Sequence, residues 1–129
     1  MNKIDLVSSA MIGVDKIPVV NERALLKEGL DQMREKGLGV VCIVKKDGCL
    51  EAIFTDGDLR RLIEAEGPSA INKRIGELSI NVPQSIETTE LLYNAQAIFN
   101  EKKVDCIIVT ESGKAVGKID IQDMNKLKA

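Results

Sequence analysis

The sequence predicts a mixed α/β fold, of the α+β kind, built from two copies of one β-α-β-β-α unit. Two observations carry this prediction: the chain is similar to itself at a fixed offset, and the same order of apolar runs and turn signals occurs twice. A unit of about 60 residues buries little apolar surface by itself. We therefore expect the two copies to pack as one intertwined, pseudo-two-fold module, with a ligand cleft between them.

The internal repeat is expected at an offset of 65 residues without a gap, since Asp58 then falls on Asp123. The same offset pairs Leu62 with Leu127, Gly48 with Gly113, Ile43-Val44 with Ile108-Val109, Leu26 with Leu91, Glu22 with Glu87 and Pro18 with Pro83. We place the first repeat at residues 1–66, a linker at 67–70 and the second repeat at 71–129.

Apolar periodicity and turn residues indicate the elements of each copy. The first copy is expected to have a helical lead-in over 2–11, a strand over 17–20, a helix capped by Asn21 and ended near Gly37, strands over 40–44 and 49–54 joined by a turn over 45–48, and a helix from Asp56 to about Ala65. The second is expected to have a lead-in over 71–78, a strand over 80–83, a helix capped by Thr88, strands over 105–110 and 115–119, and a short helix over 123–127.

The candidate site is the point where the strand ending at Phe54 runs without a loop into the helix starting near Asp56. A helix N-terminus has free backbone N–H groups and a partial positive charge, so it suits a phosphate. Thr55 offers a hydroxyl there and Asp58 a carboxylate. The same two residues also fit a capping box, in which they bond only to each other's backbone. Both interpretations stay open, and they are compatible.

Composition excludes several classes of function. A net charge of −2 without a basic stripe argues against nucleic acid as a partner. The absence of histidine removes the commonest general base and metal ligand. Cys42, Cys49 and Cys106 lie in apolar runs without a close pair and are expected to be reduced thiols. We find no catalytic constellation, and expect no enzyme activity, metal or resident cofactor.

No apolar run approaches the length of a membrane span and the N-terminus lacks a signal-peptide pattern. We therefore expect a cytoplasmic protein without a membrane partner.

Two stretches resemble the signature of a known family. Ala-Ile-Phe-Thr-Asp-Gly-Asp over 52–58 and Gly-Lys-Ile-Asp-Ile-Gln-Asp over 117–123 resemble the strand–helix junctions of a tandem CBS-domain pair, or Bateman module. With Asp15-Lys16-Ile17-Pro18 upstream, residues 53–61 resemble the C-terminal CBS pair of arabinose-5-phosphate isomerases, which act in lipopolysaccharide biosynthesis. Sugar nucleotidyltransferases with CBS pairs carry a similar signature. Ala52 stands for the usual Gly, and Asp120 for the usual Thr or Ser.

The resemblance implies a non-catalytic regulatory module that binds a nucleotide (AMP, ADP, ATP or CMP-Kdo) and controls a sugar isomerase domain. It implies that Asp58 holds the ribose, that Thr55 and the helix start hold a phosphate, and that strand backbones read the base. The implied nucleotide-binding residues are Ile17, Val40, Thr55, Asp56, Asp58, Arg61, Val82, Asp105, Asp120 and Asp123. Arg61 either contacts phosphate or pairs with Glu64.

Two further expectations concern assembly and the difference between the clefts. CBS pairs commonly associate, so we expect a homodimer. Asp120 places a negative charge where Thr55 is neutral, so we expect anionic nucleotides to prefer the Asp58 cleft. The alternative function is an oligomerisation module with no bound ligand.

Overall fold

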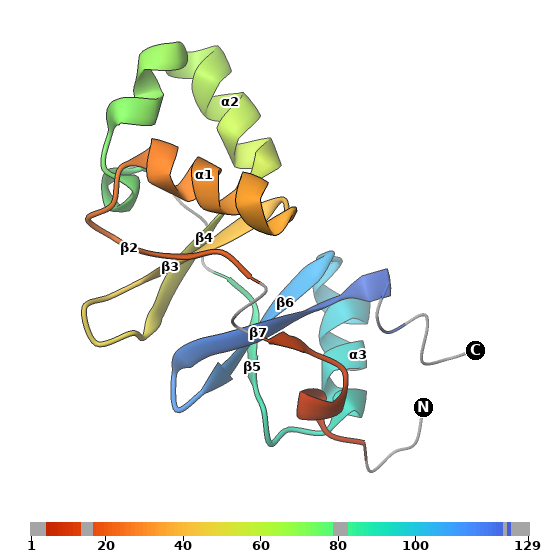
Figure 1. Ribbon diagram of the computed structural model, residues 1–129. Helices are drawn as coiled ribbons and strands as arrows, with labels where there is room; N and C mark the ends of the chain where they lie inside the picture. Colours follow the sequence, from red (N-terminus) through yellow and green to blue (C-terminus); the bar gives the residue numbers. More distant parts are fainter. Residues whose placement is uncertain (1–4, 14–16, 79–82, 123, 125–129) are drawn as a thin grey trace. The chain divides into compact units, whose positions relative to one another are not determined.

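The computed structural model describes residues 5–13, 17–78, 83–122 and 124. The chain divides into two compact units, each with its own sheet and apolar core (Figure 1). The central unit is residues 15–82, and the terminal unit combines residues 1–14 with 83–129. Two small sheets and three helices confirm the predicted mixed α+β class.

The central unit contains one three-stranded sheet in the order β2-β3-β4, with β2 parallel to β3 and β4 antiparallel to it. Its elements are β2 (Val19–Asn21), α1 (Leu26–Lys36), β3 (Val40–Val44), β4 (Leu50–Thr55), α2 (Asp56–Glu66) and the 3₁₀ turns η3 (Pro68–Asn72) and η4 (Ile75–Glu77). Its core comprises Leu26, Met33, Val41, Ile43, Ala52, Phe54 and Ile75. Alternate residues of β3 and β4 supply this core, as expected for strands with one face against helices.

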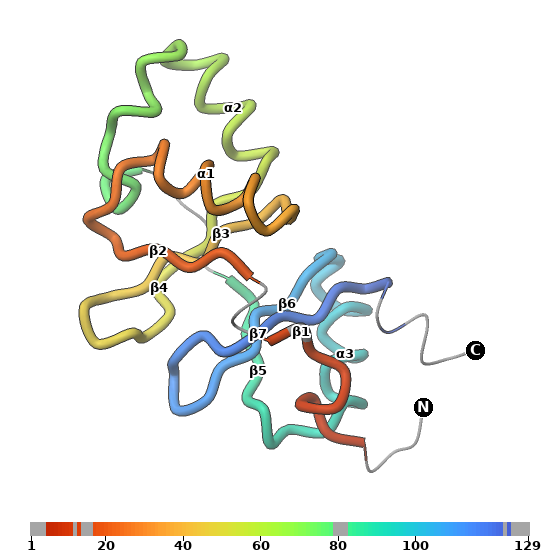
Figure 2. Tube along the Cα trace, viewed as in Figure 1, coloured from red at the N-terminus to blue at the C-terminus, as the bar shows by residue number. Residues whose placement is uncertain are grey.

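The terminal unit contains a four-stranded sheet in the order β1-β7-β6-β5. Its elements are the 3₁₀ turn η1 (Val7–Ser9), β1 (Ile12–Gly13), β5 (Ser85–Glu87), α3 (Leu92–Lys102), β6 (Cys106–Glu111) and β7 (Lys114–Asp120). Strand β1 was not predicted; it is two residues long and pairs antiparallel with β7. Figure 2 shows this early segment lying beside the late strand β7.

The lead-in segments are exchanged between the sequence repeats. Val7, from the N-terminal lead-in, is buried in the terminal core, and Ile75 is buried in the central core. Each follows an isolated antiparallel bridge to the residue before a helix: Leu6 pairs with Leu91, and Arg74 pairs with Leu25. The compact units therefore differ from the repeat boundaries at residues 66–71, which stay a prediction about the sequence repeat.

The first half of the repeat has an offset of 66 residues, not 65. Strand β2 places Val19 opposite Cys42, and β5 places Ser85 opposite Ile108, so both partners shift by 66. The helices agree, because α1 begins at Leu26 and α3 at Leu92. The predicted pairing of Leu26 with Leu91 is therefore wrong.

The second half returns to an offset of 65 after the hairpin. Val40 lies opposite Thr55 and Cys106 lies opposite Asp120, so the second strand shifts by one residue less than the first. The β6–β7 hairpin is thus one residue shorter than the β3–β4 hairpin. The prediction of a gapless repeat was wrong because the deletion lies in a turn, where length varies most readily.

Both predicted N-caps were wrong. The Asn21 side chain accepts from the N–H of Arg23 at 2.9 Å, which forms a local turn instead of a helix start. Thr88 donates its N–H to Thr110 O at 3.0 Å and so continues the strand pairing. The predicted end of α1 is confirmed, since Gly37 adopts the left-handed conformation with φ of 69°.

Candidate functional site

Strand β4 passes directly into helix α2 at Thr55, and a capping box fixes this junction. The Thr55 hydroxyl accepts from the N–H of Asp58 at 3.2 Å. Asp58 Oδ2 accepts from the N–H of Thr55 at 2.9 Å and from its hydroxyl at 3.0 Å. The capping interpretation is therefore confirmed. Because Thr55 uses its hydroxyl in both directions, its structural effect is to hold the Asp58 carboxylate in place.

Asp58 also contacts Arg61, one turn further along α2. Arg61 Nη2 lies 2.7 Å from Asp58 Oδ1. The Asp58 side chain is 10% exposed, whereas that of Arg61 is 64% exposed. Of the alternatives considered for Arg61, the structure thus shows an ion pair, but with Asp58 in place of the predicted Glu64. A mobile guanidinium on a nearly buried carboxylate gives this site both charges.

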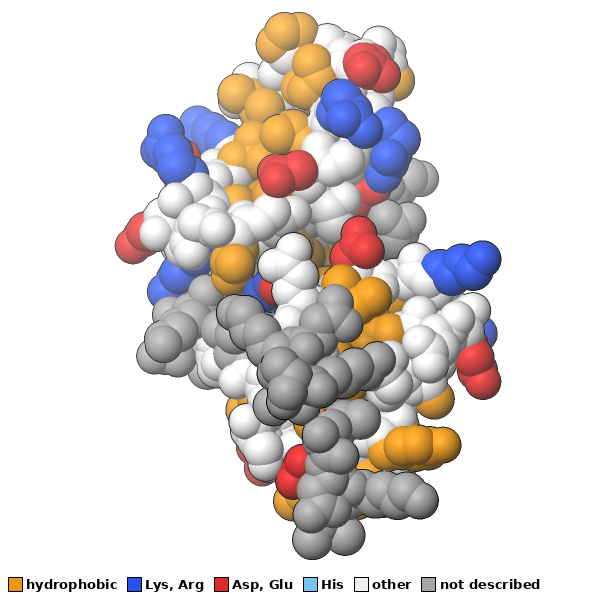
Figure 3. All heavy atoms as spheres, turned by 90° about the vertical axis from the view of Figure 1, so that its right-hand side faces the viewer, with side chains coloured by type: hydrophobic (Ala, Val, Ile, Leu, Met, Phe, Trp, Pro, Cys, Tyr) orange, Lys and Arg blue, Asp and Glu red, His pale blue; other side chains and the backbone are white. Residues whose placement is uncertain are grey.

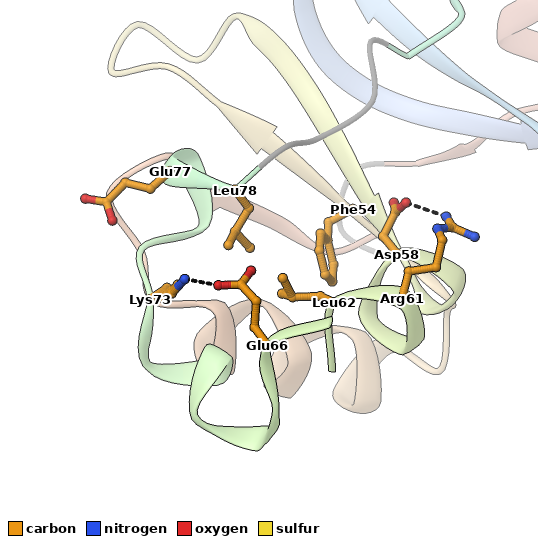
Figure 4. Close-up of a pocket in the computed structure, with 8 residues that line it drawn as sticks. All are labelled: Phe54, Asp58, Arg61, Leu62, Glu66, Lys73, Glu77 and Leu78. Carbon is orange, nitrogen blue, oxygen red and sulfur yellow. Dashed lines mark hydrogen bonds and ion pairs between the residues drawn. The ribbon is translucent and has the colours of Figure 1, made fainter. Parts of the chain in front are cut away.

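A pocket of about 410 Å³ opens beside this junction, wholly within the central unit (Figure 4). Its middle is apolar and comes from Phe54, Leu62 and Leu78. One end carries the Asp58–Arg61 pair and the other carries a second ion pair, Glu66 with Lys73. Such a volume is within the range of small-molecule sites, which combine apolar walls with a few polar groups.

Sequence reasoning missed the far end of this pocket. Asp58, Leu62 and Glu66 recur every fourth residue of α2, so helical spacing could have placed Glu66 on the face of Asp58. Lys73 had no such signal, because the turn η3 brings it back to the end of the helix.

The other predicted residues of the central unit lie around the same junction. Asp56 is exposed, and its N–H donates to Gly39 O at 3.0 Å. Val40 is buried and pairs with Thr55 across the two strands. Ile17 is buried just before β2. The structure thus brings Val40, Thr55, Asp56, Asp58 and Arg61 together. Predicted residues Val82 and Asp123 lie outside the described residues.

The terminal unit has a second strand–helix junction with different chemistry. A hollow of about 380 Å³ is lined by Asp105, Asp120, Ile121 and Gln122. Asp120 pairs with Lys118, whose Nζ lies 2.5 Å from Asp120 Oδ2. Lys118 is buried and therefore offsets part of the Asp120 charge from within the sheet. The predicted residues Asp105 and Asp120 line one hollow in this unit.

A third hollow, of about 360 Å³, lies between α1 and α2 of the central unit. Leu30, Met33, Leu38 and Leu59 line it together with Arg34 and Asp56. Figure 3 shows hydrophobic side chains gathered over these helices, with Lys and Arg side chains on either side. This groove lacks converging polar groups of the kind that the Asp58 pocket has.

Two findings limit the chemistry of the part of the chain that the structure describes. Within it, no three His, Cys, Asp or Glu side chains are grouped so as to hold a metal ion. Nor is any helix in the described ranges long and apolar enough to cross a membrane.

Comparison with known proteins agrees with this geometry. The family model for the CBS domain matches residues 7–65. AcuB from Vibrio cholerae, described as a putative acetoin utilization protein, superposes with a TM-score of 0.81 at 18% identity, covering 97% of this chain and 90% of AcuB. CBSX2, a CBS-pair protein solved in complex with AMP, gives 0.74 at 19% identity, with 96% of each chain covered. The chain is a CBS-domain pair.

Curated relatives of this CBS pair are arabinose 5-phosphate isomerases. KdsD of Salmonella typhi is 28% identical over 120 residues, which are 92% of this chain and 36% of the relative. GutQ of Escherichia coli K12 is 28% identical over 84% of this chain and 34% of the relative. The chain thus spans about a third of the length of these enzymes. The match confirms the resemblance to their CBS region.

Proposed function

We propose that this CBS-pair regulatory module binds a nucleotide at the Thr55–Asp58 junction of the central unit. The observation that carries the proposal is Asp58, a nearly buried carboxylate held by a capping box at one end of an apolar pocket. A carboxylate so held can accept two hydrogen bonds from a ribose diol. The AMP complex of the structurally similar CBSX2 supports a nucleotide as the ligand class.

In this proposal Arg61 changes partner when the nucleotide binds. Asp58 Oδ1 now accepts from Arg61, and a ribose hydroxyl would take that place. An ion pair with one largely exposed member contributes little, about 0–1 kcal/mol, so its release costs little. The freed guanidinium would then bind the phosphate, together with the N-terminus of α2. Thr55 keeps its hydrogen bonds to Asp58 and positions the carboxylate.

We further propose that the module regulates an arabinose-5-phosphate isomerase, which would place it in lipopolysaccharide biosynthesis in the cytoplasm. The curated relatives support this, since their match extends over most of this chain. The effector would be an adenine nucleotide or the sugar nucleotide CMP-Kdo. A homodimer is part of the same proposal, and light scattering at micromolar concentration would test it.

The proposed function is tested by calorimetry with AMP, ATP and CMP on the wild type, Asp58→Asn and Asp123→Asn. Asn keeps the shape of the side chain but loses the charged acceptor, so we expect Asp58→Asn to weaken binding about tenfold or more. Asp123→Asn, at the corresponding sequence position of the second repeat, is expected to keep most of the affinity. Circular dichroism controls for folding in both variants.

Two results would contradict the proposal. Equal losses in the two variants would show that the Asp58 junction is not the preferred site. A wild type that binds none of the nucleotides would favour the alternative, an oligomerisation module. In that case none of the nucleotides would stabilise the fold, whereas a true ligand at a hundredfold its Kd adds about 2.7 kcal/mol.

A further inference from the structure

We propose that Glu66 and Lys73 read the nucleobase and select bases that carry an exocyclic amino group beside an unprotonated ring nitrogen. This inference rests on the proposed nucleotide site and adds a specificity element to it. It concerns the far end of the Asp58 pocket, which the sequence signature of the junction does not include.

The backbone brings these two side chains together from different elements. Glu66 is the last residue of α2, and Gly67 then reverses the chain with φ of 85°. The turn η3 returns it, and Lys73 follows with its N–H donating to Ala70 O at 3.0 Å. The Lys73 carbonyl accepts from the N–H of Leu26 at 2.8 Å, which ties it to the start of α1. The position of the ammonium group is therefore fixed by the fold at its backbone.

The pocket has the length and surface that a nucleoside needs. At 1.5 Å per residue, the eight-residue separation of Asp58 and Glu66 along α2 corresponds to about 12 Å. Phe54, only 2% exposed, forms the back wall, and Leu62 and Leu78 complete the apolar middle. Figure 4 shows these three side chains between the two ion pairs. A ribose held by Asp58 would place the base on the apolar middle, with its far edge at Glu66 and Lys73.

The chemistry of that edge favours amino bases. Glu66 offers a charged acceptor and Lys73 a charged donor, side by side. Adenine and cytosine present an amino donor beside a ring-nitrogen acceptor, which matches this order. Hypoxanthine and uracil present a carbonyl acceptor beside a ring N–H, which reverses it. A site built to hydrogen-bond one arrangement leaves its own groups unpaired with the other.

The test is calorimetry on the full chain with AMP, IMP, CMP and UMP as probes. We expect the wild type to prefer AMP over IMP, and CMP over UMP, about tenfold, the effect of one charged hydrogen bond at a partly exposed site. Glu66→Gln is expected to bring both ratios close to one. The double variant Glu66→Lys with Lys73→Glu keeps an ion pair but reverses its order, so it is expected to favour IMP and UMP.

Glu77→Gln is the matched control. Glu77 also lines the pocket, but Figure 4 shows its carboxylate pointing away from the apolar middle, so both ratios should stay at the wild-type value. Because the Glu66 side chain is 40% exposed, Glu66→Gln is expected to fold even if the double variant does not. Melting temperatures check this point.

Failure of this inference can be told from failure of the proposed function. If the wild type binds all four nucleotides alike, or if Glu66→Gln keeps the wild-type ratios, Glu66 and Lys73 do not read the base. Binding at Asp58 then still stands, and Asp58→Asn measures it independently. If none of the four nucleotides binds, both the nucleotide site and the base selection are wrong.

Discussion

The two strand–helix junctions share one backbone but carry opposite side-chain chemistry. The N–H of Asp56 donates to Gly39 O at 3.0 Å, and the N–H of Ile121 donates to Asp105 O at 2.9 Å. In the central unit the carboxylate is therefore on the helix and faces a glycine. In the terminal unit the carboxylate is on the residue before the strand and the helix residue is apolar.

The residue before each helix differs in the same way. Thr55 closes a capping box with Asp58, while Asp120 forms an ion pair with Lys118 of its own strand. Strand pairing and core residues preserve the backbone in both units, so the side chains at each junction are free to diverge. A repeat of structure in this protein is thus not a repeat of ligand chemistry.

The largest expected effect concerns the exchanged lead-in segments. Ile75→Ala removes a fully buried side chain from the central core, and we expect it to lower the free energy of unfolding by about 2–5 kcal/mol. Val7→Ala makes the matching change in the terminal core, with a smaller loss because fewer atoms are removed. Hydrogen exchange should locate each loss, in residues 17–78 for Ile75 and in residues 83–122 for Val7.

Ser8→Ala, at an exposed position of η1, is the control and should leave the stability within about 0.5 kcal/mol. If Val7→Ala lowered protection in its own sequence repeat, the exchange of segments would be contradicted.

A smaller effect separates the two members of the Lys118–Asp120 pair. Asp120→Ala leaves a buried ammonium without this partner, and we expect a loss of about 1–3 kcal/mol of stability. Lys118→Ile introduces the residue that the central unit has at the corresponding position, Ile53, and leaves a carboxylate that is 35% exposed to water. We therefore expect it to cost less than about 1 kcal/mol. Urea denaturation of both variants measures the difference, and a larger loss for Lys118→Ile would contradict it.

The smallest expected effect is at the cap of α2. Thr55→Ala removes the hydroxyl that bonds Asp58 and should cost about 1 kcal/mol of stability. Thr55→Ser keeps the hydroxyl and serves as the control in thermal unfolding. Equal melting temperatures for Ala and Ser would show that the capping box contributes nothing, and the contrast with Asp120 would then lose its physical basis.

Much of the fold was predictable because local signals agreed with it. The apolar run of β3, the turn at Gly48 and the stop at Gly37 all occur where periodicity and backbone chemistry placed them. The helix starts were not predictable, because Asn21 and Thr88 have good capping side chains but bond elsewhere. Strand β1 was missed because two residues carry no periodicity.

The candidate site was predictable only where its residues are close in sequence. Thr55, Asp58 and Arg61 lie within two turns of one helix, so their contacts follow from helical geometry. The Glu66–Lys73 pair depends on how η3 folds back, and the equivalence of Gly39 with Asp105 depends on a one-residue deletion in a distant hairpin. Neither leaves a local trace in the sequence.

The exchanged N-terminal segment has a consequence for the order in which the protein is made. Residues 5–13 are synthesised first, yet their partners come last: Val7 donates to Glu90 O at 2.9 Å, and β1 pairs with β7. The central unit is continuous in sequence and can fold as soon as residue 82 has left the ribosome. The terminal unit must wait for β7, with its first residues held apart across the whole central unit. During synthesis, the half of the molecule that carries the candidate nucleotide site can therefore be complete while the other half is still unfolded.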